Sequence, residues 1–341
     1  MRLLTLLAGA RDGGAETFFV TLSGAFVRSG HDVHAIIRHN PPRAAALRDA
    51  GVRVTETAFG RWLDFQTGRA IDRAIAQLQP QAALSFMSRA SAFMPRGPFP
   101  KVARLGGFYD LKYFRRCDHL ACITEGIRRH VIDLGWPAGR ASVIANFAEP
   151  DASPPADRAA LGTPADAPVV FTPARLHQAK ALDVLLKAVA RLDGVYLWIA
   201  GSGPEETALK TLARELGVAD RVVFLGWQAE TGAYFRSCDV VAFPSRHEPF
   251  GTVTLEAWAY GKPLVVSDAD GPAEFVTPEV DALMVPRDAI EPLAEALRRA
   301  IEDKDLAARL VAGATERHGR HFTREACVRS YVDLFERLSA A

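Results

Sequence analysis

Short apolar runs alternate with longer segments of helical spacing along most of the chain. The runs RLLTLLA (2–8) and HDVHAIIR (31–38) are typical of buried strands, and AETFFVTLSGAFVRSG (15–30) between them repeats its apolar positions as a helix does. Strands that alternate with helices predict βαβ units, and therefore a parallel sheet with helices on both faces. Further strands are expected at AALSF, KVARL, HLACI and ASVIA.

The alternation is interrupted by FAEPDASPPADRAALGTPADAP, residues 147–168, which contains five prolines. Such a stretch is typical of a linker. The pattern then restarts, with strands expected at VVFTPAR, VYLWIAG, RVVFLGW, DVVAFPS and KPLVVS. We therefore predict an N-terminal domain over residues 1–147, a linker over 148–167 and a C-terminal domain over 168–322. A last helix at about 323–338 has a single apolar stripe and is expected to pack back onto the first domain.

Two parallel sheets of this kind place their ligands in a predictable position. Open α/β sheets bind ligands beyond the carboxyl ends of their strands. Two such sheets facing each other would leave a cleft between those ends, and we expect the functional site there.

Two glutamates flank a Pro-Phe-Gly turn in RHEPFGTVTLE, residues 246–256. Glu248 is expected in a strand-to-helix turn, and Glu256 inside the helix that follows. The first amides of that helix, near residues 250–253, would lack intrahelical partners, and such amides bind oxygen-rich ligands. Because carboxylates accept hydrogen bonds from hydroxyls, the stretch fits a polyhydroxy ligand. The alternative is a solvated loop acid and a helix-surface acid.

The glutamate pair and its neighbours resemble a known family. Together with TPARLHQAKALDVLLKAVA, IAGSGPEE, VVFLGW and GPAEFV, the pair resembles the motifs of the retaining, nucleotide-sugar-dependent glycosyltransferases of family 4. GGAETFFVTLSGAFVRSGHDV and VIANFAEPD resemble the family's N-terminal segments, so the resemblance covers essentially the whole chain. It implies the GT-B fold, with two Rossmann-like parallel-sheet domains facing a cleft.

The resemblance also implies an activity. It would be that of a hexosyltransferase that moves a sugar from a nucleotide-diphosphate donor to a glycan or glycolipid acceptor with retention of configuration. The segment RLGGFYDLKYFRRCDHLACITEGIRRHVIDLGWP is similar to bacterial enzymes of lipopolysaccharide and surface-polysaccharide synthesis. The alternatives are a nucleotide-sugar epimerase of the same fold and a catalytically inactive, sugar-nucleotide-binding partner protein.

Roles for particular residues follow from the resemblance. Arg175 and Lys180 would hold the donor diphosphate, since two cations suit phosphates whose charge grows as the sugar leaves. Glu248 would hold the transferred sugar, and Glu256 the ribose. The alternative is that Arg175 and Lys180 are surface charges with no role in binding the donor. The other donor-side positions implied are Gly13, Gly14, Gly226, Trp227 (with core packing as the alternative), Phe250, Gly251 and Thr252.

The chain departs from the family in its first domain. Relatives often carry histidines near the reacting sugar, but this sequence has no histidine between His39 and His119. The usual histidine contact is therefore expected to be missing. The polar candidates for the acceptor side are Glu16, Arg89, Tyr109 and Asp110, and a structural role is the equal alternative for the last three.

No metal and no cofactor are expected. The sequence DAD at residues 268–270 has the Asp-x-Asp spelling, but it follows an expected strand and is interpreted as a loop. Basic side chains would stabilise the leaving diphosphate instead of a metal.

Charge is divided unevenly along the chain. Residues 1–148 hold 20 lysines and arginines against 11 acidic residues, a net charge of +9, while residues 149–341 hold 21 against 29, a net charge of −8. A basic and aromatic cluster lies within residues 104–129 and suits contact with an anionic membrane surface. The alternative is that several of its aromatic residues belong to the core and that its arginines are scattered over a solvated face. No partner role for nucleic acid is expected. The cluster consists of Arg104, Phe108, Tyr109, Lys112, Tyr113, Phe114, Arg115, Arg116, Arg128 and Arg129.

The cellular compartment is inferred from targeting patterns, apolar runs and cysteines in the sequence. It shows neither a signal peptide pattern nor an apolar run of spanning length. Its four cysteines form no CxxC pair and are interpreted as buried thiols. We therefore expect a cytoplasmic protein, peripheral on the inner face of the cytoplasmic membrane. Those cysteines are Cys117, Cys122, Cys238 and Cys327.

Overall fold

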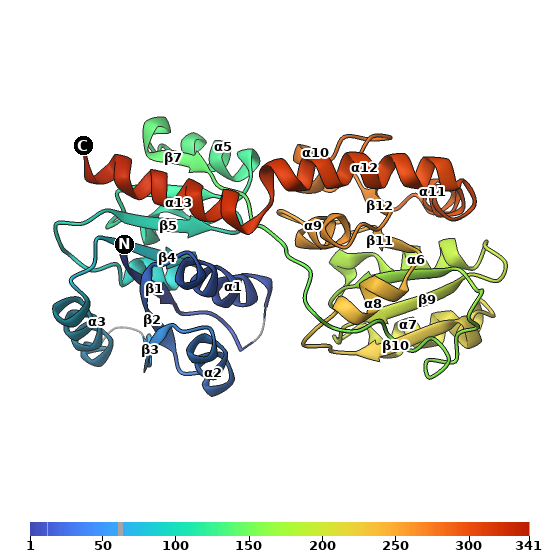
Figure 1. The fold of residues 1–341 in the computed structure, drawn as a ribbon, viewed down its shortest axis with the longest axis horizontal. Coiled ribbons are helices and arrows are strands. Elements are labelled where there is room, and N and C mark those ends of the chain that lie inside the picture. The colour runs from blue at the N-terminus through green and yellow to red at the C-terminus, as the bar shows by residue number, and fades with distance from the viewer. Residues whose placement is uncertain (12, 61–63, 341) are drawn as a thin grey trace. The chain divides into compact units, whose positions relative to one another are not determined.

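The computed structural model describes residues 1–11, 13–60 and 64–340. It divides the chain into two compact units (Figure 1). Unit 1 comprises Met1–Asn146 and Arg324–Ala341, and unit 2 comprises Phe147–Thr323. Each unit is one parallel sheet with its own helices.

Unit 1 contains a seven-stranded sheet in the order β3-β2-β1-β4-β5-β6-β7, and every strand pair in it is parallel. Its central strands are buried on both faces, which explains why they are near-continuous apolar runs. The strands are β1 (Arg2–Leu7), β2 (Asp32–Arg38), β3 (Arg53–Thr57), β4 (Ala82–Phe86), β5 (Lys101–Leu105), β6 (His119–Cys122) and β7 (Ala141–Val143). The helices are α1 (Gly14–Arg28), α2 (Pro41–Asp49), α3 (Phe65–Leu78), α4 (Met87–Ala92), α5 (Glu125–Asp133) and α13 (Arg324–Ser339).

Unit 2 contains a six-stranded sheet in the order β10-β9-β8-β11-β12-β13, again with every pair parallel. The same doubly wound order therefore occurs twice in one chain, and the predicted fold class of two Rossmann-like parallel-sheet domains is confirmed. The strands are β8 (Val169–Pro173), β9 (Tyr196–Ala200), β10 (Val222–Gly226), β11 (Val240–Phe243), β12 (Leu264–Ser267) and β13 (Leu283–Val285). The helices are α6 (Leu182–Val189), α7 (Glu206–Glu215), α8 (Gly232–Ser237), α9 (Thr252–Ala259), α10 (Pro272–Phe275), α11 (Ile290–Glu302) and α12 (Lys304–His321).

The last helix of the chain belongs to unit 1, far from its neighbours in sequence. The ring of Tyr331 in α13 lies 5.9 Å from that of Phe26 in α1, and Phe335 lies 6.5 Å from Phe26. Tyr331 and Phe335 are both fully buried. The apolar stripe of α13 is therefore covered by the first helix of the chain (Figure 1).

The proline-rich segment before β8 is attached to unit 2 and is not a free connection. Arg158 donates hydrogen bonds to the carbonyl of Ala167, at 3.0 Å, and to the carboxylate of Asp239, at 2.9 Å. Thr163 accepts a hydrogen bond at 3.0 Å from the indole of the buried Trp198. Side chains that lack helical or strand periodicity fix this segment, so periodicity alone did not reveal its attachment.

Each helix of the described chain is too short or too polar to span a bilayer. All four cysteines are buried and free, as the sequence predicted. Desolvation raises the pKa of each of these thiols to about 12, so they are inert rather than reactive.

Candidate functional site

In unit 2, strand order reverses between β8 and β11, and the loops that follow these two strands lie next to each other. Ligands of doubly wound sheets bind at such a switch point. The loop after β8 carries Arg175 and Lys180, and the loop after β11 carries Glu248. The three residues that the sequence assigned to catalysis therefore come from the two loops at the switch point.

Lys180 and Glu248 form an ion pair. Their side chains are 20% and 15% exposed, so the pair is largely shielded from water. The ammonium of Lys180 also lies 5.2 Å from the ring centre of Phe243, the last residue of β11. A lysine held by a carboxylate and an aromatic face keeps a defined position, and its remaining N–H groups are available to a ligand.

Arg175 is exposed, and its guanidinium forms neither a hydrogen bond nor an ion pair with any residue the structure describes. The backbone beside it, in contrast, is tightly fixed. The amide of Leu176 donates to the carbonyl of Ser202 at 3.0 Å, in the Gly-Ser-Gly loop after β9. A Cβ on Gly201 would lie 2.0 Å from the carbonyl oxygen of Ala174, so this close approach requires glycine. Arg175 is thus an exposed cation next to a hydrogen-bonded, closely packed backbone.

The Pro-Phe-Gly turn presents its backbone rather than its side chain. Phe250 is buried and stacks on Phe275, with ring centres 5.1 Å apart. Gly251 caps α9 at φ +90°, and the amide of Gly271 donates to the carbonyl of Glu248 at 2.8 Å. Within the described part of the chain, the amides of Phe250, Gly251 and Val253 donate to no protein acceptor. Donors of this kind at a helix start suit phosphate or hydroxyl oxygens.

Glu256 lies in the second turn of α9 and is partly exposed. Its carboxylate accepts no hydrogen bond from the residues that the structure describes. Desolvation raises the pKa of Glu256 to about 7. A carboxylate in such a position lacks the donors that it needs, and ligand hydroxyls are suited to supply them.

The donor-side pair Gly226 and Trp227 lies at the carboxyl end of β10. Gly226 has φ +69° at a bulge, and its carbonyl accepts a hydrogen bond from the amide of Gly201 at 2.7 Å. Trp227 is 64% exposed, so the alternative that it packs in the core is wrong. An exposed indole that follows β10, at the carboxyl edge of the same parallel sheet, is free to stack on a ligand ring.

In unit 1, Glu16 lies in the first turn of α1, and its carboxylate contacts the β1–α1 loop. The carboxylate accepts a hydrogen bond from the amide of Ala10 at 2.7 Å, and Glu16 is buried. A Cβ on Gly13 would lie 2.4 Å from its Oε2 atom, while Gly14 has open space around it. The carboxylate of Glu16 therefore holds the glycine loop in shape, and its acceptor-side role stays a prediction.

A residue that sequence reasoning missed holds the same loop from the other side. Arg43 of α2 is buried, and its guanidinium donates to the carbonyls of Ala10, at 2.7 Å, and Arg11, at 2.8 Å. Arg43 lies in a short helix with almost no apolar periodicity, and no motif or pattern in the sequence distinguishes it.

The other three acceptor-side residues differ in what they contact. Asp110 caps a 3₁₀ turn, accepting from the amide of Lys112 at 2.9 Å and pairing with its ammonium at 2.7 Å, so its carboxylate is engaged. Tyr109 is half-buried, and desolvation raises the pKa of its hydroxyl. Arg89 in α4 is exposed, with no partner among the described side chains. The acceptor-side roles of Arg89, Tyr109 and Asp110 stay predictions.

A histidine does approach the loop after β5, but from α5. His130 lies 5.2 Å from the ring of Phe108, and its Nε2 atom is 3.3 Å from the carbonyl oxygen of Tyr109. Only the tertiary structure brings it there, because it follows the loop by about 20 positions in the sequence.

The basic and aromatic cluster is smaller than the sequence predicted. Arg104 is buried between the rings of Phe18 and Phe86, at 4.8 and 4.9 Å, and donates to Asn146 at 2.6 Å. Burial lowers the pKa of its guanidinium. Phe114 is buried as well, and Tyr109 is half-buried; Lys112 pairs with Asp110, and Arg128 with Glu125. The remaining exposed members are Phe108, Tyr113, Arg115, Arg116 and Arg129.

The carboxylates of Asp268 and Asp270 are both paired with one arginine. Arg287 lies 3.3 Å from Asp268 and 3.4 Å from Asp270, and its amide donates to Asp268 at 2.9 Å. Among the described residues, no group of three or more His, Cys, Asp or Glu side chains is arranged to hold a metal ion.

Comparison with known proteins gives a family for each half of the chain. Residues 12–152 match the model of "Glycosyltransferase Family 4", and residues 154–317 match that of "Glycosyl transferases group 1". The chain is 38% identical to the lipopolysaccharide core biosynthesis glycosyltransferase LpsE of Rhizobium meliloti, over 95% of this chain and 96% of the relative. It is 37% identical to LpsD of the same organism, over 96% of both chains.

The fold has a close counterpart among solved structures. Anabaena Alr3699/HepE, crystallised in complex with UDP, superposes with a TM-score of 0.84 at 21% identity over the whole of both chains. That likeness shows a shared fold, which is the GT-B arrangement expected from the sequence.

Proposed function

The chain belongs to the group 1 and family 4 glycosyltransferases, and we propose that it transfers a sugar from a nucleoside-diphosphate donor to a glycan or glycolipid acceptor with retention of configuration. The finer parts of this proposal are the donor class, the hexosyl group and the stereochemistry.

One observation carries the proposal: the ion pair between Lys180 and Glu248 at the switch point of unit 2. It places a cation for phosphate oxygens beside a carboxylate for sugar hydroxyls, next to the outward amides of Phe250 and Gly251. Arg175 supplies a second, unpaired cation from the same loop as Lys180. A nucleoside-diphosphate sugar presents this combination of phosphates and hydroxyls to one binding surface.

The proposed reaction needs no enzyme nucleophile. The bond between the anomeric carbon and the phosphate oxygen breaks, and the acceptor oxygen bonds to the same carbon on the same face. The acceptor's proton passes to the departing phosphate oxygen. Lys180, Arg175 and the turn amides stabilise the negative charge that grows on the diphosphate. Glu248 and the turn backbone hold the sugar in position, and Glu256 holds the ribose.

The acceptor is proposed from the relatives' names and from the remaining basic surface. LpsE and LpsD are named for lipopolysaccharide core biosynthesis, so we propose a lipopolysaccharide or related surface glycan as acceptor class. Arg115, Arg116 and Arg129, with the exposed rings of Phe108 and Tyr113, would contact an anionic membrane peripherally. We place this contact on the cytoplasmic face of the membrane.

A donor screen tests the proposal. UDP-glucose is the first probe, because the Anabaena protein was also crystallised with it. UDP-, GDP- and ADP-sugars are compared by thermal shift, and a ligand at 100 times its dissociation constant stabilises by about 2.7 kcal/mol. The protein is then incubated with the stabilising sugar nucleotide, and release of the nucleoside diphosphate is measured. Slow hydrolysis supports a transferase, conversion to another nucleotide sugar supports an epimerase, and binding without either supports an inactive binder.

A further inference from the structure

The loop that carries Lys180 is held in an unfavourable backbone conformation. A single 3₁₀ turn, Gln178–Lys180, leads directly into Ala181, which has φ +52° and ψ +36°. Residues other than glycine rarely adopt this left-handed backbone conformation. Where such a residue does adopt it, the surrounding structure holds it there. Something other than local preference must therefore hold the loop.

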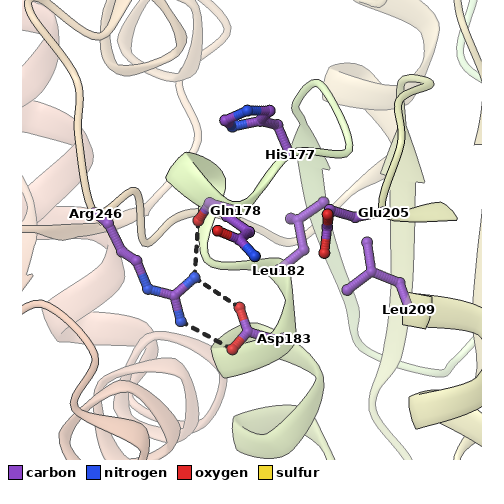
Figure 2. Close-up of a pocket in the computed structure, with 7 residues that line it drawn as sticks. All are labelled: His177, Gln178, Leu182, Asp183, Glu205, Leu209 and Arg246. Carbon is purple, nitrogen blue, oxygen red and sulfur yellow. Dashed lines mark hydrogen bonds and ion pairs between the residues drawn. The ribbon is translucent and has the colours of Figure 1, made fainter.

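Arg246 of the β11–α9 loop holds it by both its backbone and its side chain (Figure 2). Its amide donates to the carbonyl of Ala179 at 2.8 Å. Its Nη1 atom donates to the carbonyl of Gln178 at 2.8 Å. The same guanidinium forms a bidentate pair with Asp183, at 2.9 and 2.8 Å. Arg246 thus binds the chain immediately before Lys180 and again in the first turn of α6.

These contacts lie where the loop borders a cavity. The cavity, of about 380 Å³, is lined by Gln178 and Leu182, by Arg246 and Asp183 themselves, and by Glu205 and Leu209 (Figure 2). On this side of the loop the hydrogen bonds of Arg246 supply contacts next to open space. Nε of Arg246 also pairs with Asp288 at 2.5 Å, which anchors the guanidinium itself.

Lys180 is held at two points, its side chain and its backbone. Glu248 pairs with the side chain of Lys180, and Arg246, two positions earlier on the same loop, fixes the backbone that carries it. We propose that Arg246 is a positioning residue for the donor diphosphate, and that it acts through Lys180 without touching the donor. This inference rests on the proposed function, in which Lys180 contacts the diphosphate.

To test the inference, we measure how much the two phosphates of a nucleoside diphosphate contribute to its affinity for the protein. UDP, GDP and ADP are titrated against the full-length wild type, and the tightest is used further together with its nucleoside. The ratio of the nucleoside dissociation constant to that of the diphosphate reports the phosphate contacts alone. Arg246→Gln should lower this ratio about tenfold, which corresponds to about 1.4 kcal/mol, and leave the nucleoside affinity unchanged. Arg246→Lys, which keeps the charge and loses the bidentate geometry, should restore part of the ratio.

A double variant shows whether the effect passes through Lys180. Lys180→Ala should lower the ratio by itself, and Arg246→Gln should add nothing further in the Lys180→Ala background, because a positioned group that is absent cannot be mispositioned. Arg299→Gln is the matched control, since Arg299 makes a bidentate pair with Glu279 at 2.8 Å elsewhere in unit 2. It should leave the ratio at the wild-type value.

The possible failures differ from one another. If Lys180→Ala lowers the ratio but Arg246→Gln only lowers the melting temperature, Arg246 is structural and the inference is wrong. Losses that multiply in the double variant would show an effect that bypasses Lys180, which also overturns it. If Lys180→Ala leaves the ratio unchanged, the proposed diphosphate contact is wrong, and the inference falls with it.

Discussion

Lys180 and Glu248 stand 68 positions apart in the sequence and form one largely shielded ion pair. The contact couples a residue assigned to the diphosphate with one assigned to the sugar. Removing either side chain leaves the other charge partly buried without its partner, which costs more than an exposed ion pair is worth. Loss of the Lys180 side chain is therefore expected to lower both activity and stability, whereas loss of the Arg175 side chain is expected to lower activity alone.

Replacing the two cations tests that separation. Arg175→Ala and Lys180→Ala should each cost roughly 2–4 kcal/mol of transition-state stabilisation, the scale of one preorganised donor. Arg175→Ala should leave the unfolding free energy unchanged, because the guanidinium is exposed and unbound within the described structure. Lys180→Ala should also lower the unfolding free energy by about 1–2 kcal/mol, since Glu248 loses its partner. Steady-state kinetics and urea unfolding measure the two effects, and near-normal turnover in both variants would refute the diphosphate assignment.

Glu256 is expected to make stability depend on pH. Its folded pKa of about 7 lies above the usual 4.5, so the folded state favours the protonated form. The corresponding stability is present below pH 4.5 and is lost as the pH rises through 7. Compared with wild type, Glu256→Gln should therefore gain about 1–3 kcal/mol of unfolding free energy between pH 5 and pH 8. Urea titrations of both proteins at four pH values measure the difference, and a constant difference would contradict the raised pKa.

The same residue is expected to bind the ribose as a carboxylate. The affinity of wild type for the nucleoside should increase as the pH rises from 6 to 8, because ionised Glu256 accepts two hydroxyl hydrogen bonds. Glu256→Gln should bind it more weakly by about 1–3 kcal/mol at pH 8 and show no such increase. Calorimetry with the nucleoside avoids the titration of a terminal phosphate. Equal affinity of the two proteins at pH 8 would assign Glu256 to the helix surface alone.

Activity is expected to be independent of metal ions. Arg287 occupies the carboxylates of Asp268 and Asp270, and the growing charge on the diphosphate is left to Lys180 and Arg175. Turnover in excess EDTA should match that in buffer, and NMR of the product should show that an α-linked donor gives an α linkage. Activity that is lost in EDTA and restored by magnesium or manganese, or a β-linked product, would contradict the proposed mechanism.

The exposed arginines of unit 1 are expected to bind anionic membranes. Each basic residue close to such a surface adds about 1 kcal/mol. Sedimentation with liposomes should increase with anionic lipid content and decrease with salt, as the Debye length falls below about 8 Å. Charge reversal at Arg115, Arg116 and Arg129 should release the protein and leave donor hydrolysis unchanged.

A variant with the same change in charge elsewhere is the control for membrane binding. Arg69, Arg73 and Arg96 are also exposed arginines of unit 1, and their reversal should leave sedimentation unchanged. Equal release by both triple variants would mean that net charge, and not this surface, drives binding. Wild type that stays in solution with anionic liposomes at low salt would refute membrane contact.

The sequence alone determined the two parallel sheets and the identity of the switch-point residues. Buried parallel strands are apolar on both faces, so β1, β4, β8 and β11 are legible as short runs, and helix periodicity marks the elements between them. Weakly patterned elements such as α2 gave no comparable signal. The glutamates that flank Phe250 were recognised because a motif is local in sequence.

Only the tertiary structure decided what those residues contact. Side-chain partners depend on distances between segments far apart in the chain, which periodicity does not encode. Arg104 was counted as a surface cation and is buried between two aromatic rings. Glu16 was assigned to an acceptor and holds its own loop, while Arg246, which no motif distinguished, fixes the backbone of the lysine at the site. The sequence determines which polar and charged side chains the chain has. Packing determines which of them bind other residues and which remain available to bind a ligand.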